Sequence, residues 1–195
     1  MGMLNVFASM AVPNFAHAVE VQQCAIEGRY SFTSKVGTGA QGESLQWTEE
    51  IIKESVLTAN VVLGNLIRGV SFSAEKGPAT EGRLSIRFDT APEGKPAGGE
   101  ADKLGGSKIE IYQSNLNTER KREQYTAVGD VLAHEIGHCF GLSHEKGGPH
   151  DNREGYLMNE LLDKLIEHSG SQFSISLTDR EEFWKFVNKN PKRCH

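Results

Sequence analysis

The stretch HEIGHCFGLSH, residues 134 to 144, constrains this chain more than any other part of its sequence. His134 and His138 are four residues apart, so on an α-helix they lie on one face and can bind the same metal ion. An unbroken helix would carry His144 about 15 Å further along the axis than His134. Because zinc needs each imidazole nitrogen within about 2.1 Å, the helix must end in between. Gly141 can end it, since glycine adopts the left-handed conformation that commonly terminates helices.

The predicted ligand set, His134, His138 and His144, leaves one position of a tetrahedral zinc ion open, as in catalytic rather than structural sites. Glu135 is rotated about 100° around the helix from His134, off the ligand line but close enough to hydrogen-bond a water molecule in the open position. HExxH alone arises by chance, but the eleven-residue form fixes five positions. The pattern therefore favours a zinc centre over a coincidence.

The motif HExxHxxGxxH, followed by Tyr156, Leu157 and Met158, resembles the signature of metzincin zinc metalloproteases, including their Met-turn. Over roughly residues 28 to 190 the order of elements is closest in style to matrix-metalloproteinase-like and serralysin-like catalytic domains. The resemblance implies that Met158 lies beneath the histidines and that the chain after Gly141 forms a smaller lower subdomain. Glu145 directly after the third histidine is instead typical of astacins, so the subfamily stays open.

Hydrophobic periodicity predicts the elements around the motif. Predicted strands cover 28–34, 70–73, 84–88 and 109–111, and predicted helices cover 48–69, 126–140, part of 158–168, and a C-terminal stretch opened by a Thr178 and Glu181 capping box. This order indicates an α+β fold, in which a twisted mixed β-sheet is backed by a long helix and the zinc-site helix. A small C-terminal subdomain ends in the last helix.

The 195 residues suffice for one domain. We expect a leader over 1–25, either a signal or a pro-segment remnant, and a single catalytic domain over 26–195. By the resemblance, its upper part spans about 26–141 and its lower part about 142–195. Within the leader, the fairly apolar stretch 3–18 ends in the small-residue sequence Ala16, His17, Ala18, which favours a weak or truncated export signal and a secreted or periplasmic protein. A loosely packed leader is the alternative.

Three cysteines leave several arrangements open. Cys24 and Cys194 could form a disulfide if the protein is exported, and Cys139 is expected to be a buried, inert thiol on the core side of the zinc helix. A Cys24 thiolate that blocks the zinc is ranked below both a disulfide and a free cysteine. The segment around it lacks the pro-segment motif of cysteine-switch zymogens.

Composition excludes some partners. A formal net charge of −5 gives no electrostatic case for nucleic acid, and no apolar run approaches a membrane span. The segment 89–107, rich in glycine and proline, is predicted to be a solvated surface loop. Its acidic residues Asp89, Glu93, Glu100 and Asp102 could hold calcium, but no ligand spacing supports this. We expect a monomer.

The resemblance to metzincins implies that the protein is a zinc-dependent endopeptidase. Zinc would lower the pKa of a water molecule to about 7, and Glu135 would take its proton and pass it to the leaving amine. Two alternatives remain: a non-catalytic zinc protein that binds a peptide or partner, and a zinc hydrolase of a non-protein amide. Leucines between residues 158 and 165 suggest an apolar preference for the residue after the scissile bond.

Overall fold

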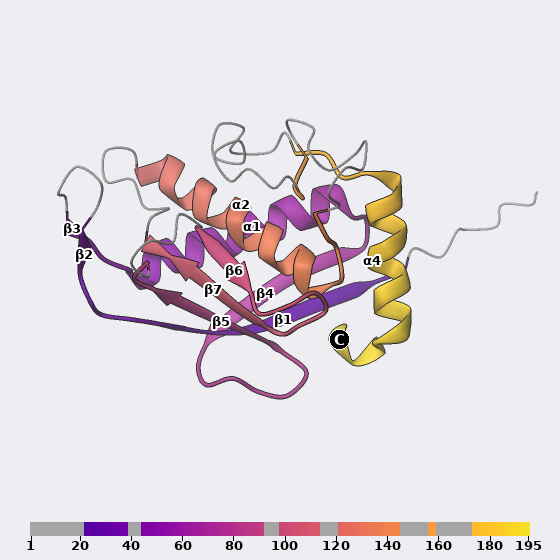
Figure 1. Cartoon of the computed structure of the whole chain (residues 1–195), viewed down its shortest axis with the longest axis horizontal. Coiled ribbons are helices and arrows are strands. Elements are labelled where there is room, and N and C mark those ends of the chain that lie inside the picture. Colours follow the sequence, from indigo (N-terminus) through magenta and orange to yellow (C-terminus); the bar gives the residue numbers. More distant parts are fainter. Residues whose placement is uncertain (1–21, 39–43, 92–97, 114–120, 145–155, 159–172) are drawn as a thin grey trace, which may run out of the picture.

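A five-stranded sheet is the centre of the structure (Figure 1). The computed structural model describes residues 22–38, 44–91, 98–113, 121–144, 156–158 and 173–195, with residues 121–124 as backbone only. The strands are β1 (Cys24–Phe32), β4 (Val70–Lys76), β5 (Leu84–Asp89), β6 (Gly99–Ala101) and β7 (Lys108–Tyr112), in the order β4-β1-β5-β7-β6. The first four are parallel, and β6 pairs antiparallel with β7. The predicted mixed sheet is thus confirmed.

One face of the sheet is buried and the other is polar. Along β1, Cys24, Ile26 and Tyr30 are buried, while the residues between them are more exposed, as the two-residue period of a strand requires. On the opposite face Arg29 of β1 lies directly across from Glu75 of β4, and their side chains form an ion pair of 2.8 Å. The apolar face therefore needs a covering layer.

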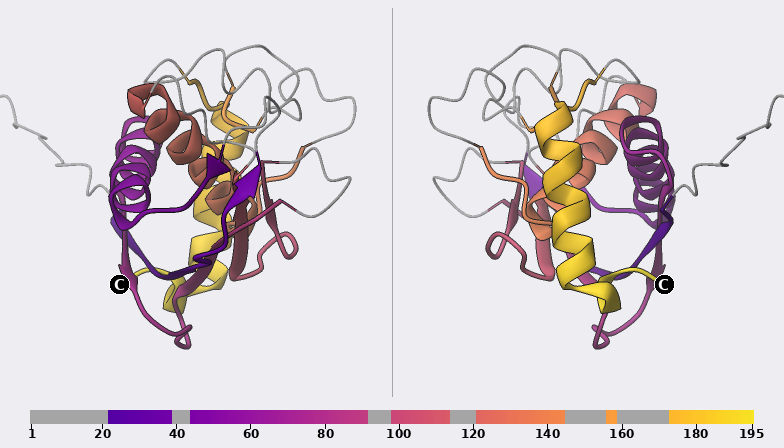
Figure 2. Two further views of the ribbon diagram at one scale, coloured as in Figure 1. Left: turned by 90° about the vertical axis from the view of Figure 1, so that its left-hand side faces the viewer. Right: turned by 90° about the vertical axis from the view of Figure 1, so that its right-hand side faces the viewer.

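Helices α1 (Glu49–Leu66) and α2 (Lys121–Cys139) provide that layer, lying side by side on one face of the sheet (Figures 1 and 2). The Thr48 side chain caps α1 by accepting the Ile51 amide, and the chain turns away at Gly69, whose φ is 88°. α2 begins at residue 121, earlier than the predicted 126. Its predicted core residues Val128, Leu132 and Ile136 are fully buried.

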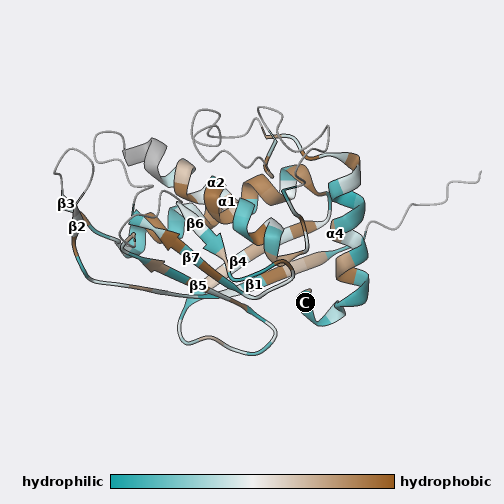
Figure 3. Ribbon diagram, in the orientation of Figure 1, coloured by the Kyte–Doolittle hydropathy of each residue, from teal (hydrophilic) through white to brown (hydrophobic). Residues whose placement is uncertain are grey.

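The last helix, α4 (Leu177–Lys189), stands across the end of the molecule where α2 finishes, and the short 3₁₀ helix η2 (Pro191–Arg193) follows it (Figure 1). Phe183 of α4 stacks on Phe140 with ring centroids 4.9 Å apart. Figure 3 shows hydrophilic and hydrophobic residues along α4, and its Phe183 and Val187 are buried. The predicted capping box was wrong by two residues, because Ser176 and Asp179 have the same spacing as Thr178 and Glu181 and form the box instead.

The structure corrects the prediction that 89–107 is entirely loop, because β6 lies within it. Gly99 is glycine for a packing reason: a Cβ there would lie 2.9 Å from Val131 of α2 and 3.0 Å from Ile111 of β7. Helix α2 therefore approaches this edge of the sheet closely. The predicted helix within 158–168 lies almost wholly outside the described residues.

Cys24 and Cys194 form a disulfide, and Cys139 is a free, fully buried thiol. The pairing rules out a Cys24 thiolate facing the predicted metal site. Strand β1 begins at Cys24, just before the predicted domain start at 26, and the division into leader and catalytic domain stays a prediction. Across the described segments, no helix is long and apolar enough to cross a membrane.

The α1–α2 contact depends on Gly129, because a Cβ at this position would overlap the Thr58 side chain and lie 2.8 Å from the Ser55 carbonyl oxygen. We predict that Gly129→Ala lowers the free energy of unfolding by about 1 to 3 kcal/mol, despite the better helix propensity of alanine. Urea unfolding of the metal-free protein measures this. The control is Gly77→Ala, whose Cβ would meet its nearest atom, in Arg29, at an ordinary 3.7 Å. An equal effect of both substitutions would contradict the prediction.

Candidate metal centre

The end of α2 brings the three histidines together. His134 and His138 lie on consecutive turns, and the helix then closes in a Schellman motif, in which the Gly141 amide donates to the His138 carbonyl and the Leu142 amide to the Gly137 carbonyl, both at 3.0 Å. Gly141 adopts a φ of 84°, the left-handed conformation predicted for it. The chain thereby reverses and returns His144 to the face that carries the other two histidines.

The Nε2 atoms of the three side chains converge. His134 Nε2 lies 3.1 Å from His138 Nε2 and 2.8 Å from His144 Nε2, and the three residues can offer ligand atoms that all lie within 4.8 Å of one another. Three nitrogens at 2.1 Å from one tetrahedral zinc ion would be about 3.4 Å apart. The spacing fits a shared metal ion.

Hydrogen bonds fix which nitrogens carry protons. His134 Nδ1 lies 2.6 Å from the Leu157 carbonyl, and His138 Nδ1 lies 2.7 Å from the Leu142 carbonyl. A carbonyl only accepts, so each Nδ1 must donate, and in the neutral ring Nε2 then presents a lone pair. Burial lowers the pKa of His134 to about 3 and that of His138 to about 4, which keeps both rings neutral. Converging lone pairs with no proton between them repel unless a cation lies there, so this donor set suits zinc.

Residues 156–158 lie beneath the histidines. Tyr156 bridges to Ser174, and the Leu157 amide donates to the Ser174 carbonyl at 3.1 Å, which leaves the Leu157 carbonyl to His134. Met158 is buried against Gly137, where a Cβ would lie 2.6 Å from its Sδ. The structure thus places Met158 next to the turn of helix between two of the histidines.

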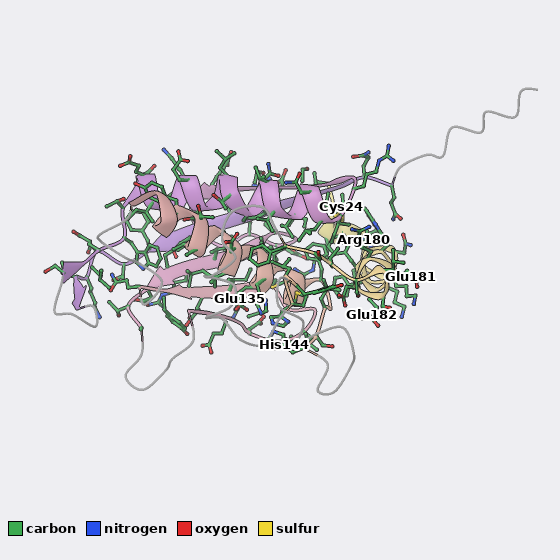
Figure 4. All side chains as sticks on the ribbon, turned by 90° about the horizontal axis from the view of Figure 1, so that it is seen from above. Cys24, Glu135, His144, Arg180, Glu181 and Glu182 are labelled. Atoms are coloured by element: carbon green, nitrogen blue, oxygen red, sulfur yellow. A yellow bond between two sulfur atoms is a disulfide. The ribbon has the colours of Figure 1, made fainter. Side chains whose placement is uncertain are left out.

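Glu135 lies on the other side of α2 from this support and is only 3% exposed. Its carboxylate accepts a hydrogen bond from the Ala101 amide of β6, while burial, together with the negative charge of Glu100, raises its pKa to about 8. Figure 4 shows Glu135 and His144 in the same central region, below α2 in that view. The carboxylate is held between the metal-site helix and β6.

Strand β6 directs alternate main-chain groups away from β7, and the Ala101 amide among them reaches Glu135. The Gly98 carbonyl and the Asp102 amide bond to Tyr112 and Lys108 of β7, so in an antiparallel pair Gly99 and Ala101 direct their main-chain groups away from β7. Sequence reasoning missed this role of Ala101, and likewise the carbonyls of Leu142 and Leu157. All are main-chain groups, for which no residue type is diagnostic.

The described residues give no support to calcium. The Tyr112 hydroxyl lies 2.6 Å from a Glu100 oxygen, Asp89 pairs with Arg87, and Asp102 accepts from the Lys108 amide. Within the described ranges, the three histidines are the group of metal-binding side chains that the structure brings together. Glu93, the remaining possible calcium ligand, lies outside those ranges. So does most of the segment 158–165, which we expect to line the substrate pocket.

Comparison with known proteins shows a likeness of fold alone. No protein-family profile and no curated protein sequence matches the chain. Among solved structures, the archaemetzincin of Methanopyrus kandleri is similar, with a TM-score of 0.54 and 12% identity over 85% of this chain and 96% of that one. The archaemetzincin of Archaeoglobus fulgidus, solved with malonate, gives a TM-score of 0.48 at 12% identity, covering 81% and 99%. This chain has an archaemetzincin-like fold, and the matrix-metalloproteinase or serralysin style stays a prediction.

The converging nitrogens predict one zinc ion per chain. We expect His138→Ala to abolish stoichiometric zinc binding, because only two of the three histidines remain. The removed imidazole is partly buried, so the core should lose little. Metal analysis after dialysis measures the stoichiometry. The control His195→Ala removes a histidine at the exposed C-terminus and should keep full zinc. Full zinc in His138→Ala would contradict the ligand assignment.

The contact between Gly137 and Met158 gives a second prediction. Gly137→Ala should weaken zinc binding about tenfold, because the added methyl displaces Met158 and with it the Leu157 carbonyl that orients His134. Met158→Ala introduced in the same chain should recover part of the loss by making room. Competition with a chromophoric chelator measures the affinities. Additive losses in the double variant would argue against this contact.

Proposed function

We propose that this protein is a zinc-dependent endopeptidase in which Glu135 is the general base. The observation that carries the proposal is the pair of hydrogen bonds that Nδ1 of His134 and His138 donate to main-chain carbonyls, which keep the proton on Nδ1 and leave the Nε2 lone pairs converging with His144. Glu135 supplies a buried carboxylate one residue from the first ligand. Together they form the donor set and the base of a hydrolytic zinc site.

His134, His138 and His144 would hold the ion. When bound, zinc would supply a Lewis acid that makes a water molecule more acidic and polarises a carbonyl group. Glu135 accepts the proton of the attacking water and returns it to the leaving amine. The Ala101 amide holds the Glu135 carboxylate, so the base is oriented before a substrate arrives.

The neighbouring strand supports an extended peptide as the substrate. In the described part of the chain, β6 pairs with β7 on one side only. A peptide in extended conformation can add to such an edge through main-chain hydrogen bonds, whatever its side chains. Because Ala101 of this edge bonds Glu135, a peptide paired there passes beside the base. A small non-protein amide would make no use of the strand.

The alternative of a zinc protein that binds a partner without cleaving it is less well supported. A binding site of that kind has no need of a buried carboxylate beside the ligands, and burying Glu135 raises its pKa, which is a cost to the fold.

We further propose a secreted or periplasmic protein that acts as a monomer, with an apolar preference for the residue after the scissile bond. The Cys24–Cys194 disulfide supports the location, because such bonds persist in oxidising compartments.

Cleavage of denatured casein tests the proposal. Glu135→Ala should keep one zinc per chain but lose activity by about a hundredfold to ten-thousandfold, because it removes proton transfer and no ligand. The matched control is Glu182→Ala on α4, which removes a carboxylate remote from the histidines and should cleave like the wild type. Zinc content is measured in all three proteins.

Activity retained in zinc-loaded Glu135→Ala would remove Glu135 as the base. A zinc-loaded wild type that cleaves neither casein nor a peptide library would favour the binding protein. Cleavage sites mapped in the library test the apolar preference, which acidic or basic residues after the scissile bond would contradict.

A further inference from the structure

The C-terminal Arg193 is connected to the metal centre by a chain of hydrogen bonds. Its Nη2 donates to the carbonyl oxygens of Gly105, at 2.9 Å, and Gly106, at 2.7 Å. The Gly105 amide in turn donates to the His138 carbonyl at 2.9 Å. Only one backbone loop therefore separates the guanidinium from a histidine of the metal site.

The loop between β6 and β7, residues 102–107, has a conformation that needs this support. Gly105 has a φ of 69°, and a Cβ there would lie 2.9 Å from the Phe186 ring of α4. The loop is held internally by the Gly106 amide, which donates to the Lys103 carbonyl at 2.9 Å. Its two glycine carbonyls point toward Arg193, where one nitrogen of a planar, permanently charged group satisfies both.

The same loop sets the position of two parts of the site. Through Gly105 it holds the last turn of α2, which carries His138. Through its start it fixes the end of β6, where Ala101 bonds Glu135. A cation at the C-terminal end of α2 also suits the negative end of the helix dipole.

Arg193 is itself anchored to the sheet. The adjacent Cys194 is joined to Cys24 of β1, and the His195 amide donates to the Ala25 carbonyl at 3.0 Å. Figure 4 shows Cys24 next to the C-terminal helix, at the end of the molecule where α4 stands. The backbone on either side of the Arg193 side chain is therefore held against strand β1.

We propose that Arg193 is a positioning residue of the metal centre, which holds α2 and β6 in register through the Gly105–Gly106 loop. The proposal rests on the zinc site proposed above. Without the guanidinium the loop loses its anchor, and the last turn of α2, which carries His138, no longer keeps a fixed distance from the Ala101 amide that bonds Glu135. Because Arg193 touches no ligand, its removal should alter the geometry of the site without changing the number of metal ions bound.

The experiment compares Arg193→Met, Arg193→Lys and the control Lys192→Met, which removes the same charge from the neighbouring exposed residue. Two readouts concern the metal: zinc affinity by chelator competition, and the visible absorption spectrum of the cobalt-substituted protein, which reports ligand geometry. We expect Arg193→Met to bind one zinc about tenfold more weakly, at the lower end of the range for residues that orient ligands. Its cobalt spectrum should shift, Arg193→Lys should be intermediate, and Lys192→Met should match the wild type.

The thermal midpoint of each metal-free protein separates positioning from folding. The proposal is overturned if Arg193→Met and Lys192→Met have equal zinc affinities and equal cobalt spectra. It is also overturned if Arg193→Met binds zinc more weakly but keeps the wild-type cobalt spectrum and loses thermal stability in proportion. Should Arg193→Met fail to fold, the affinity and spectrum of Arg193→Lys decide. Neither metal readout needs cleavage, so a wild type that binds zinc and cuts nothing would overturn the endopeptidase alone.

Discussion

The metal centre depends on two main-chain carbonyls, those of Leu142 and Leu157, which accept from Nδ1 of His138 and His134. These bonds settle the tautomer of each ring and aim the opposite nitrogen at a common point. One carbonyl comes from the turn that ends α2 and the other from the segment before Met158. The site therefore exists only when the helix, its terminating turn and the returning chain have all folded, and it is a product of tertiary structure.

Helix α2 connects the metal centre to the rest of the molecule. Glycines at its contacts let three neighbouring parts of the chain approach it closely. Gly129 admits α1, Gly99 lets β6 lie against Val131, and Gly137 accepts the Met158 thioether. The positions of the histidines therefore depend on how α1, β6 and Met158 pack against α2. The β6 amide that orients Glu135 also belongs to the edge strand that we propose binds a peptide.

The sequence predicted most of this arrangement because its strongest signals are local. The spacing of His134, His138 and Gly141 specifies a helix, a ligand pair and a stop, and alternating apolar residues specify the longer strands of the sheet. It could not predict β6, because a three-residue strand rich in glycine owes its conformation to pairing with β7. Nor could it reveal the main-chain partners of the histidines or the hydrogen bonds of Arg193 to the Gly105–Gly106 loop, since these depend on which distant segments meet.

The disulfide between Cys24 and Cys194 joins the first strand of the sheet to the end of the chain, so that nearly the whole described fold lies inside one covalent ring. A peptide bond cut anywhere within that ring opens it but releases nothing. This matters for a protein proposed to be an endopeptidase, because such an enzyme can be cut by its own copies. A nicked molecule keeps both pieces linked through β1 and the C-terminal segment, and its histidines stay on the same covalent body. Release of a fragment would need a second event, either another cut or reduction of the bond.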